Sequence, residues 1–338
     1  MLRRFLSGLS ALFALSLAVP ACAQQESFDS YLQQVAAKAR AEGVSEGTLT
    51  NMLAGLTPND RVTALDRDNL SGGTSAGFPP LAPYLNDHNT AARINGGRRV
   101  YARLGSLAAD VEARYGVPAP IMIAIWGHET SYGAVRGNFD LARSLATLAW
   151  EGRRRELFER ELIDLLKIAD SGVPRSTLVG SWAGAFGNPQ FLPSVYLRVA
   201  VDGDGDGDRD IWTSETDTLH SIANYFRDAG WRRGEPWAVR AYTPNSLDRA
   251  AIQTRMVSPI CPRVHVRHSR WMTVREWRAL GVIPQGAIAD DTMASLFEPD
   301  GPSAPSYLLT HNYRVILEYN CSNYYAMSVG LLADEIAR

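Results

Sequence analysis

Residues 118–133 read PAPIMIAIWGHETSYG, an apolar run that ends in a cluster of polar side chains. Pro118 suits the start of a helix, where its missing N–H would be unpaired in any case, and Gly133 suits a helix end. The segment between them is apolar on every side, so it predicts a buried helix. Such a helix would carry a glutamate, Glu129, at its C-terminal end.

The position of Glu129 predicts a carboxyl group with a raised pKa. Apolar surroundings disfavour its charged form, and the negative end of the helix dipole repels a carboxylate. A carboxyl group that keeps its proton near neutral pH can protonate a glycosidic oxygen as the bond breaks. Taken alone, the segment leaves open the alternative of a solvated glutamate at a helix end.

The whole chain predicts an α+β protein that is predominantly α-helical. Apolar residues recur at helical spacing along most of it, whereas residues 237–309 favour a small mixed or β-containing subdomain, with a strand-like run at 263–266. Glycine, serine and proline predict a long loop at residues 70–83. Helices are expected within 28–55, with a break at Gly43, and at 90–115, 118–130, 141–150, 154–169, 216–229 and 325–336.

The first residues have the features of an export signal. Two arginines precede an apolar run at residues 5–19, and Ala21-Cys22-Ala23 forms a small-x-small cleavage site. The run is shorter than the roughly 18–20 residues that span a bilayer. We therefore predict an exported, periplasmic protein without a transmembrane segment. A lipid anchor at Cys22 is the alternative, which Pro20 disfavours because a small residue is usual there.

The composition leaves uncharged and mixed-charge ligands open, and a polysaccharide fits this. Cleavage after residue 23 leaves 32 basic and 36 acidic residues, which argues against a nucleic-acid binder because such proteins show a basic surplus. The 8 tryptophans and 13 tyrosines supply rings that stack on sugar faces. Cys261 and Cys321 would remain, either paired in an oxidising compartment or as separate buried thiols.

Residues 202–213 resemble an EF-hand calcium loop. Aspartates alternate along it and Gly207 stands sixth, as in such loops. Clustered carboxylates repel one another, and hard oxygen ligands favour Ca²⁺ as the ion that relieves this. Thr213 replaces the usual glutamate at position twelve, so Glu215 or Asp217 would have to complete the site. A solvated acidic turn is the alternative. The expected ligands are Asp202, Asp204, Asp206, Asp208 and Asp217.

The residues around Glu129 resemble the catalytic motif of the lytic murein transglycosylase B family, which has a lysozyme-like fold. Two more of its signatures have similar counterparts, GSWAGAFGNPQFLPSVY at 180–196 and RVILEYN at 314–320, followed by YAM at 325–327. Shorter matches occur at 65–67 and 146–148. The chain departs from the family at NPQ, where a glycine is usual before the glutamine, and at Tyr132, where tryptophan is frequent.

The resemblance implies that Glu129 is the sole acid/base catalyst and that no cofactor takes part in catalysis. Glu129 would protonate the bond between N-acetylmuramic acid and N-acetylglucosamine in peptidoglycan glycan strands. The muramic C6 hydroxyl would then close onto C1, giving a 1,6-anhydro sugar without water. A bridge between Cys261 and Cys321 would help to fix the wall of the sugar-binding groove. The residues expected to line this groove are Ser181, Gln190, Phe191, Tyr225, Tyr319, Asn320 and Tyr325.

Two alternatives to this function stay open. A hydrolytic lysozyme would use Asp140 or another acid to direct water at C1, and a noncatalytic, calcium-stabilised wall-binding scaffold would need no catalyst. We expect the protein to be a monomer. The expected parts are a signal peptide (1–23), an N-terminal helical lobe (24–115), a lysozyme-like catalytic core (116–236), the small subdomain (237–309) and a C-terminal segment that completes the core (310–338).

Overall fold

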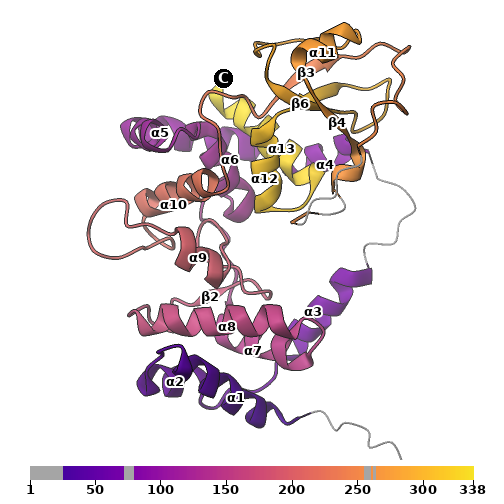
Figure 1. Cartoon of the computed structure of the whole chain (residues 1–338). Helices are drawn as coiled ribbons and strands as arrows, with labels where there is room; N and C mark the ends of the chain where they lie inside the picture. The colour runs from indigo at the N-terminus through magenta and orange to yellow at the C-terminus, as the bar shows by residue number, and fades with distance from the viewer. Residues whose placement is uncertain (1–25, 72–79, 255–259, 262–263) are drawn as a thin grey trace, which may run out of the picture.

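The computed structural model describes residues 26–71, 80–254, 260–261 and 264–338. The expected signal peptide and Cys22 lie outside the described residues. The described chain is mostly helical, with small antiparallel sheets, as predicted (Figure 1). Its helices are α1 (Phe28–Ala41), α2 (Glu46–Leu53), α3 (Asp60–Ser71), α4 (Leu81–His88), α5 (Ala91–Tyr115), α6 (Ala119–Thr130), α7 (Leu141–Glu151), α8 (Arg155–Asp170), α9 (Pro193–Val199), α10 (Glu215–Asp228), α11 (Val274–Ala279), α12 (His311–Tyr319) and α13 (Asn323–Ala337).

Helix α6 lies at the centre of the larger part of the molecule. Ile123, Ala124 and Ile125 on successive faces are fully buried, and α5, α10 and α13 pack around them. Because its side chains are apolar in every direction, α6 needs neighbours on all sides. The sequence prediction of a buried helix is confirmed, although the helix ends at Ser131 in the left-handed conformation, before Gly133.

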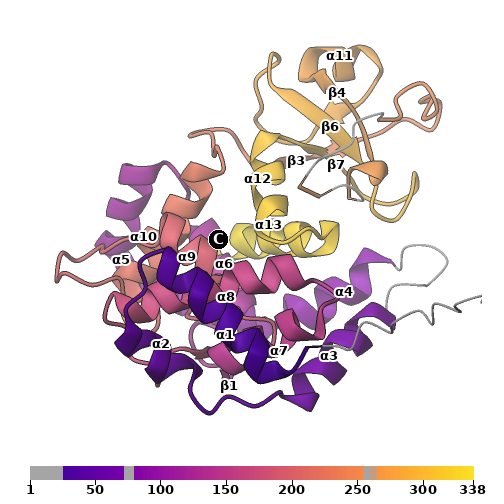
Figure 2. The same cartoon turned by 60° about the horizontal axis from the view of Figure 1, so that its bottom comes forward.

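The helices form two groups that do not follow the order of the chain. Helices α1 and α2 pack against α8, and α3 packs against α7, whereas α4 packs against α13, and α5 packs against α6 and α13 (Figure 2). The expected N-terminal lobe of residues 24–115 is therefore divided between the two groups. The short strands β1 (Phe139–Asp140) and β2 (Val179–Gly180) pair with each other, and Figure 1 shows β2 between α8 and α9.

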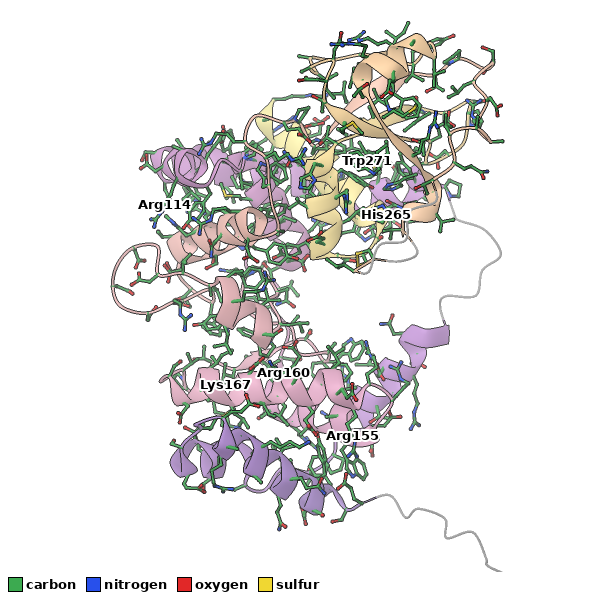
Figure 3. All side chains as sticks on the ribbon, viewed as in Figure 1. Arg114, Arg155, Arg160, Lys167, His265 and Trp271 are labelled. Carbon is green, nitrogen blue, oxygen red and sulfur yellow. A yellow bond between two sulfur atoms is a disulfide. The ribbon has the colours of Figure 1, made fainter. Side chains whose placement is uncertain are left out.

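Residues 238–309 contribute a five-stranded antiparallel sheet in the order β4-β6-β7-β3-β5. It has its own apolar core around Trp277, whose indole N–H donates to the Ala294 carbonyl at 2.9 Å. Figure 3 shows Trp271 and His265 where this subdomain meets the rest of the molecule. The strands are β3 (Ala238–Tyr242), β4 (His268–Thr273), β5 (Ile283–Pro284), β6 (Met293–Phe297) and β7 (Ser306–Leu309).

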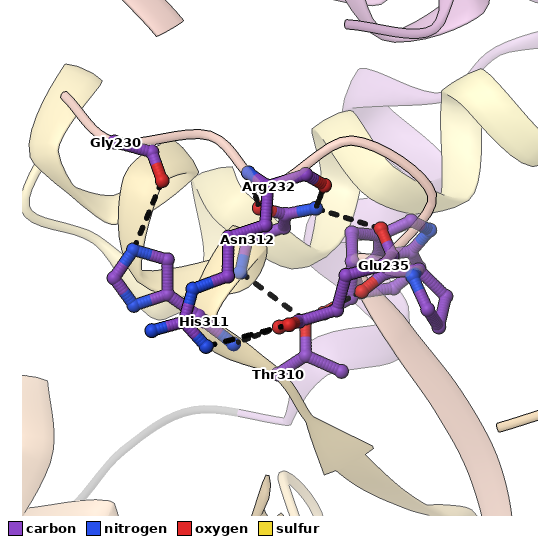
Figure 4. A network of polar contacts seen from close by, with 8 residues as sticks. Gly230, Arg232, Glu235, Thr310, His311 and Asn312 are labelled. Atoms are coloured by element: carbon purple, nitrogen blue, oxygen red, sulfur yellow. Dashed lines mark hydrogen bonds and ion pairs between the residues drawn. The ribbon is translucent and has the colours of Figure 1, made fainter. Parts of the chain in front are cut away.

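A polar network holds the two chain segments that connect the subdomain to the core (Figure 4). The Asn312 amide donates to the carbonyls of Arg232 and Glu235, at 2.9 and 2.6 Å, and its oxygen accepts the Arg232 N–H. The Glu235 carboxylate accepts the His311 N–H at 2.8 Å. The entering and leaving segments are thus tied together at the start of α12.

Two local expectations differ from the structure. Most of the predicted loop at residues 70–83 lies outside the described residues, but its last three residues form the first turn of α4, where Pro83 is tolerated because the N–H groups of a first turn have no partner within the helix. The β-favouring run at 263–266 instead contributes to a short 3₁₀ helix, η1 (Val264–Arg267). Within the described part of the chain, no helix is long and apolar enough to cross a membrane.

Candidate active site

Glu129 lies in the last turn of α6, which is followed by two consecutive residues in the left-handed conformation. Ser131 and Tyr132 both have positive φ, 50° and 60°, a conformation that costs energy for residues other than glycine. The Tyr132 ring fills a notch in front of Gly127, where an added Cβ would lie 2.6 Å from the ring. Its hydroxyl donates to the Arg93 carbonyl at 2.7 Å. This packing fixes the end of the helix that carries Glu129.

The carboxyl group of Glu129 has an altered acidity. Burial disfavours its charged form and raises its pKa from 4.5 to about 7, while a hydrogen bond from the Tyr325 hydroxyl acts in the opposite direction. That hydroxyl donates to Glu129 Oε1 at 2.5 Å. Near neutral pH both the protonated and the charged form of this carboxyl group are therefore populated, as expected for a group that must donate a proton and later accept one.

Two tyrosines from the C-terminal helices stand beside Glu129. Tyr325 comes from the first turn of α13 and Tyr319 from the last turn of α12. Burial raises the pKa of both hydroxyls, and the charge of Glu129 acts in the same direction. The Tyr319 hydroxyl donates to the Pro189 carbonyl at 2.5 Å, which connects the second and third signature segments next to Glu129.

Phe191 and Tyr225 form a layer behind Tyr319. Their side chains are 2% and 8% exposed, and the ring centres of Tyr225 and Tyr319 lie 4.7 Å apart. The Tyr225 hydroxyl donates a hydrogen bond to the Glu318 carbonyl at 2.8 Å. These two residues were expected to line a sugar-binding groove, and this stays a prediction; in the structure both rings pack against Tyr319.

The second signature segment is joined directly to α6, the helix that carries Glu129. The Thr130 hydroxyl donates to the Asn188 carbonyl at 3.0 Å. Gln190 has a positive φ of 51° and its amide donates to the Gly187 carbonyl at 2.9 Å. Ser181 accepts the Ala185 N–H on its hydroxyl at 3.0 Å. The segment is thus a folded loop whose backbone is fixed by its own side chains.

Asn320 lies at the end of α12, next to Tyr319, and its side chain is exposed. Cys321 follows it and forms a disulfide with Cys261, with the Cα atoms 5.3 Å apart. Cys261 is 2% exposed. The bond therefore attaches the corner between α12 and α13 to the buried Cys261.

Sequence reasoning missed two aromatic residues of the site. Tyr84 comes from α4, directly after the expected loop at 70–83; burial raises its pKa, and Glu129 contributes in the same direction. Its ring stacks on His88 at 3.8 Å and lies 5.5 Å from the Tyr324 ring. His128 precedes Glu129; burial lowers its pKa to about 3, so it is neutral. No motif surrounds Tyr84 in the sequence, and only its place in the fold reveals it.

Asp140, the acid expected to act in a hydrolytic alternative, is engaged elsewhere. One of its oxygens accepts the Arg143 N–H at 2.9 Å, and so begins α7. The other pairs with Arg175 at 2.9 Å. Burial raises the pKa of Glu129 and the Tyr325 hydrogen bond lowers it, and no second carboxylate is among the causes of the shift.

Three of the five expected calcium ligands are brought together. Carboxylate oxygens of Asp202, Asp204 and Asp217 lie within 4.8 Å of one another. Asp217 is fully buried, and burial together with the two negative neighbours raises its pKa. Such a set of hard oxygen ligands suits Ca²⁺. Asp206 and Asp208 are exposed and lie outside this group.

Glu215, the other residue considered for completing the loop, pairs with Arg103 at 2.7 Å. A cavity of about 620 Å³ adjoins the loop and is bounded by residues 171–174, Tyr196 and Trp212. Glu129 does not line this cavity. The chemistry of the carboxyl group, and not cavity size, therefore places the candidate active site at the end of α6.

Comparison with known proteins gives consistent matches. The transglycosylase SLT domain family matches residues 27–334. The chain is 34% identical over 226 residues to the membrane-bound lytic murein transglycosylase B of Escherichia coli, and the match covers 66% of this chain and 58% of that protein. The chain thus spans somewhat more than half the length of this relative.

Solved structures extend the similarity to almost the whole chain. SltB3 from Pseudomonas aeruginosa, in complex with NAG-anhNAM-pentapeptide, has 36% identity and a TM-score of 0.82, over 92% of this chain and 80% of that one. Soluble lytic transglycosylase SltB1 from the same organism has 31% identity and a TM-score of 0.76, over 91% and 98%. The Escherichia coli lytic transglycosylase Slt35 in complex with calcium has 28% identity and a TM-score of 0.73, over 91% and 92%.

Proposed function

This chain belongs to the transglycosylase SLT domain family, and we propose that it is a peptidoglycan lytic transglycosylase with Glu129 as its single acid/base catalyst. The observation that carries the proposal is the Glu129 carboxyl group, which has a pKa of about 7 and accepts a hydrogen bond from Tyr325. The named relatives are lytic transglycosylases, and SltB3 was solved with peptidoglycan fragments.

The proposed reaction needs one carboxyl group in two protonation states. Glu129 in its acid form donates a proton to the oxygen between N-acetylmuramic acid and N-acetylglucosamine as the bond to C1 breaks. Tyr325 then stabilises the new carboxylate through its hydrogen bond. Glu129 accepts the proton of the muramic C6 hydroxyl, and the C6 oxygen bonds to C1. The product is a 1,6-anhydro sugar, and no water is consumed.

The site residues divide into two roles in this proposal. We assign contact with the sugars to Tyr319, Tyr325 and Asn320, because aromatic rings and amides suit sugar faces and hydroxyl groups. Ser181 and Gln190 hold the second signature loop, whereas Phe191 and Tyr225 support Tyr319 from behind.

We propose that Ca²⁺ binds between Asp202, Asp204 and Asp217. Three carboxylates close together repel one another, and a divalent ion would offset this repulsion. The solved structure of Slt35 in complex with calcium supports the proposal. The ion would stabilise the connection between α9 and α10, and it takes no part in bond cleavage.

We further propose that the protein is exported to the periplasm, where its substrate lies. The arginines, apolar run and small-x-small site of residues 1–23 support this. An oxidising compartment also suits the disulfide between Cys261 and Cys321. Whether Cys22 carries a lipid is decided by mass measurement of the mature protein, which gains the mass of acyl chains in the lipid-anchored form.

Release of soluble fragments from purified cell-wall sacculi tests the function. Glu129→Gln should lose nearly all release, because glutamine cannot donate the proton. Asp140→Asn should keep most of it, since the hydrolytic alternative alone assigns Asp140 to catalysis. An inactive Asp140→Asn variant that folds, with an active Glu129→Gln variant, would overturn the proposal. Unaltered release by both would favour a second catalyst elsewhere.

A further inference from the structure

Helix α4 begins without a cap of its own. The residue before it is Pro80, which offers no side-chain hydrogen bond to the helix. Pro83 lacks an N–H, so the free donors of the first turn are those of Leu81 and Ala82. Within the described residues, the side chain that meets the Leu81 N–H comes from 219 positions away: Asp300 Oδ1 accepts it at 2.6 Å.

Asp300 belongs to the small subdomain, in the turn between β6 and β7. Its carboxylate stands at the N-terminus of α4, where a negative charge also suits the helix dipole. A second contact ties the same turn to the core: Arg267 donates to the Pro299 carbonyl and, at 3.1 Å, to the Tyr324 hydroxyl. The turn at 299–300 is therefore connected to both α4 and α13.

Helix α4 leads from this turn to the catalytic residue. One turn after Leu81, the Tyr84 ring lies 5.5 Å from the Tyr324 ring and interacts electrostatically with Glu129. At the other end of the helix, His88 lies 6.4 Å from His128, the neighbour of Glu129. Figure 1 shows α4 beside α13, the helix that supplies Tyr325. A change in the position of α4 would thus change the surroundings of Glu129.

We propose that Asp300 is a positioning residue for substrate binding, which acts by capping α4 and so holding Tyr84 at the active site. The subdomain then forms part of the sugar-binding machinery although none of its strands carries a catalytic group. The inference rests on the proposed function, because it takes the surroundings of Glu129 as the place where sugars bind.

The test compares Asp300→Ala with Asp300→Asn and Asp291→Ala. Alanine removes the acceptor, whereas asparagine keeps a capping oxygen; Asp291 is an exposed carboxylate of the same subdomain and serves as the matched control. With soluble glycan strands as substrate, Asp300→Ala should raise KM about fivefold, the size of a typical lost helix cap, and change kcat less than twofold. Asp300→Asn and Asp291→Ala should stay within twofold of the wild type.

A double-mutant cycle shows whether Asp300 acts through Tyr84. In a Tyr84→Ala background, Asp300→Ala should add less than a twofold further change, because the side chain it positions is already gone. A fivefold further loss in that background would overturn the proposal, and so would a KM for Asp300→Ala equal to that of the wild type. Faster hydrogen exchange of the α4 amides in Asp300→Ala provides the structural readout, and unchanged exchange would also contradict it.

Binding without turnover separates this inference from the proposed function. Calorimetry with NAG-anhNAM-pentapeptide on the Glu129→Gln protein should show about fivefold weaker binding when Asp300→Ala is added. If Glu129→Gln keeps full turnover, the proposed function fails while the binding comparison still stands. If binding is unchanged by Asp300→Ala while Glu129→Gln is inactive, the role of Asp300 fails alone.

Discussion

Replacing Tyr325 by phenylalanine should shift the pH dependence of the enzyme to higher pH. The Tyr325 hydroxyl donates to Glu129 at 2.5 Å and holds down the pKa that burial raises to about 7. A hydrogen bond to a charged group contributes about 1.5–3 kcal/mol, and 1.36 kcal/mol corresponds to about one pH unit. Without the hydroxyl, the acid form of Glu129 should persist to a pH about one to two units higher.

The direction follows from the chemistry of the first step. Turnover begins with Glu129 in its acid form, so activity falls as the pH rises through the pKa of this group. Tyr325→Phe should therefore move the alkaline limb of kcat/KM upward, because this quantity reports groups of the free enzyme. The absolute rate should fall, since the new carboxylate loses its hydrogen bond.

The assay is the initial rate of fragment release from sacculi at subsaturating substrate, measured across the pH range in which the enzyme stays folded. Tyr319→Phe is the matched control, because its hydroxyl donates to the Pro189 carbonyl and not to Glu129; its alkaline limb should coincide with that of the wild type. An alkaline limb that stays in place or moves downward in Tyr325→Phe would refute the assignment of Glu129 as the acid.

Three more outcomes are expected. Above pH 7 the wild type must keep a charged Glu129 in a buried place, so Glu129→Gln should be more stable there by up to about 3 kcal/mol. The stability difference is absent below pH 4.5, the ordinary pKa of the group. Equal melting temperatures of the two proteins at pH 9 would contradict the predicted gain in stability. Adding Ca²⁺ should raise the melting temperature of the wild type but not of Asp217→Ala, and an equal rise in both would exclude the proposed ligand set. Cys321→Ser should reduce the free energy of unfolding by about 2–5 kcal/mol in chemical denaturation, since the disulfide closes a loop with a sequence separation of 60; an unchanged midpoint would show that the bond does not constrain the unfolded chain.

The sequence predicted the parts of the site that depend on local pattern. Helix α6 could be recognised because a helical run that is apolar on all sides must be buried. The raised pKa of Glu129 could be predicted from its place at the end of that run. The aspartates at alternate positions likewise indicated a cation site. The structure brings two of them, Asp202 and Asp204, together with Asp217 from α10. Asp206 and Asp208 are exposed and lie outside this group.

The remaining parts depend on contacts between distant segments. Tyr84 directly follows the proline-containing stretch at 70–83 that predicts a loop, and its helix is capped by Asp300, more than 200 residues later. The spacing of apolar residues along the chain cannot reveal a capping residue that is so distant in the sequence. The expected contact of Phe191 and Tyr225 with sugars stays a prediction, and the structure adds that both rings pack against Tyr319. The division of the N-terminal helices between two groups is also decided by packing and not by chain order.

The central claim is that one carboxyl group cleaves the glycan bond by ring closure, without water. Mass spectrometry of the fragments released from sacculi in water enriched in a heavy oxygen isotope tests it most directly. The account predicts 1,6-anhydro ends that carry no heavy oxygen and that disappear with Glu129→Gln. Reducing ends that contain heavy oxygen would show hydrolysis and contradict it.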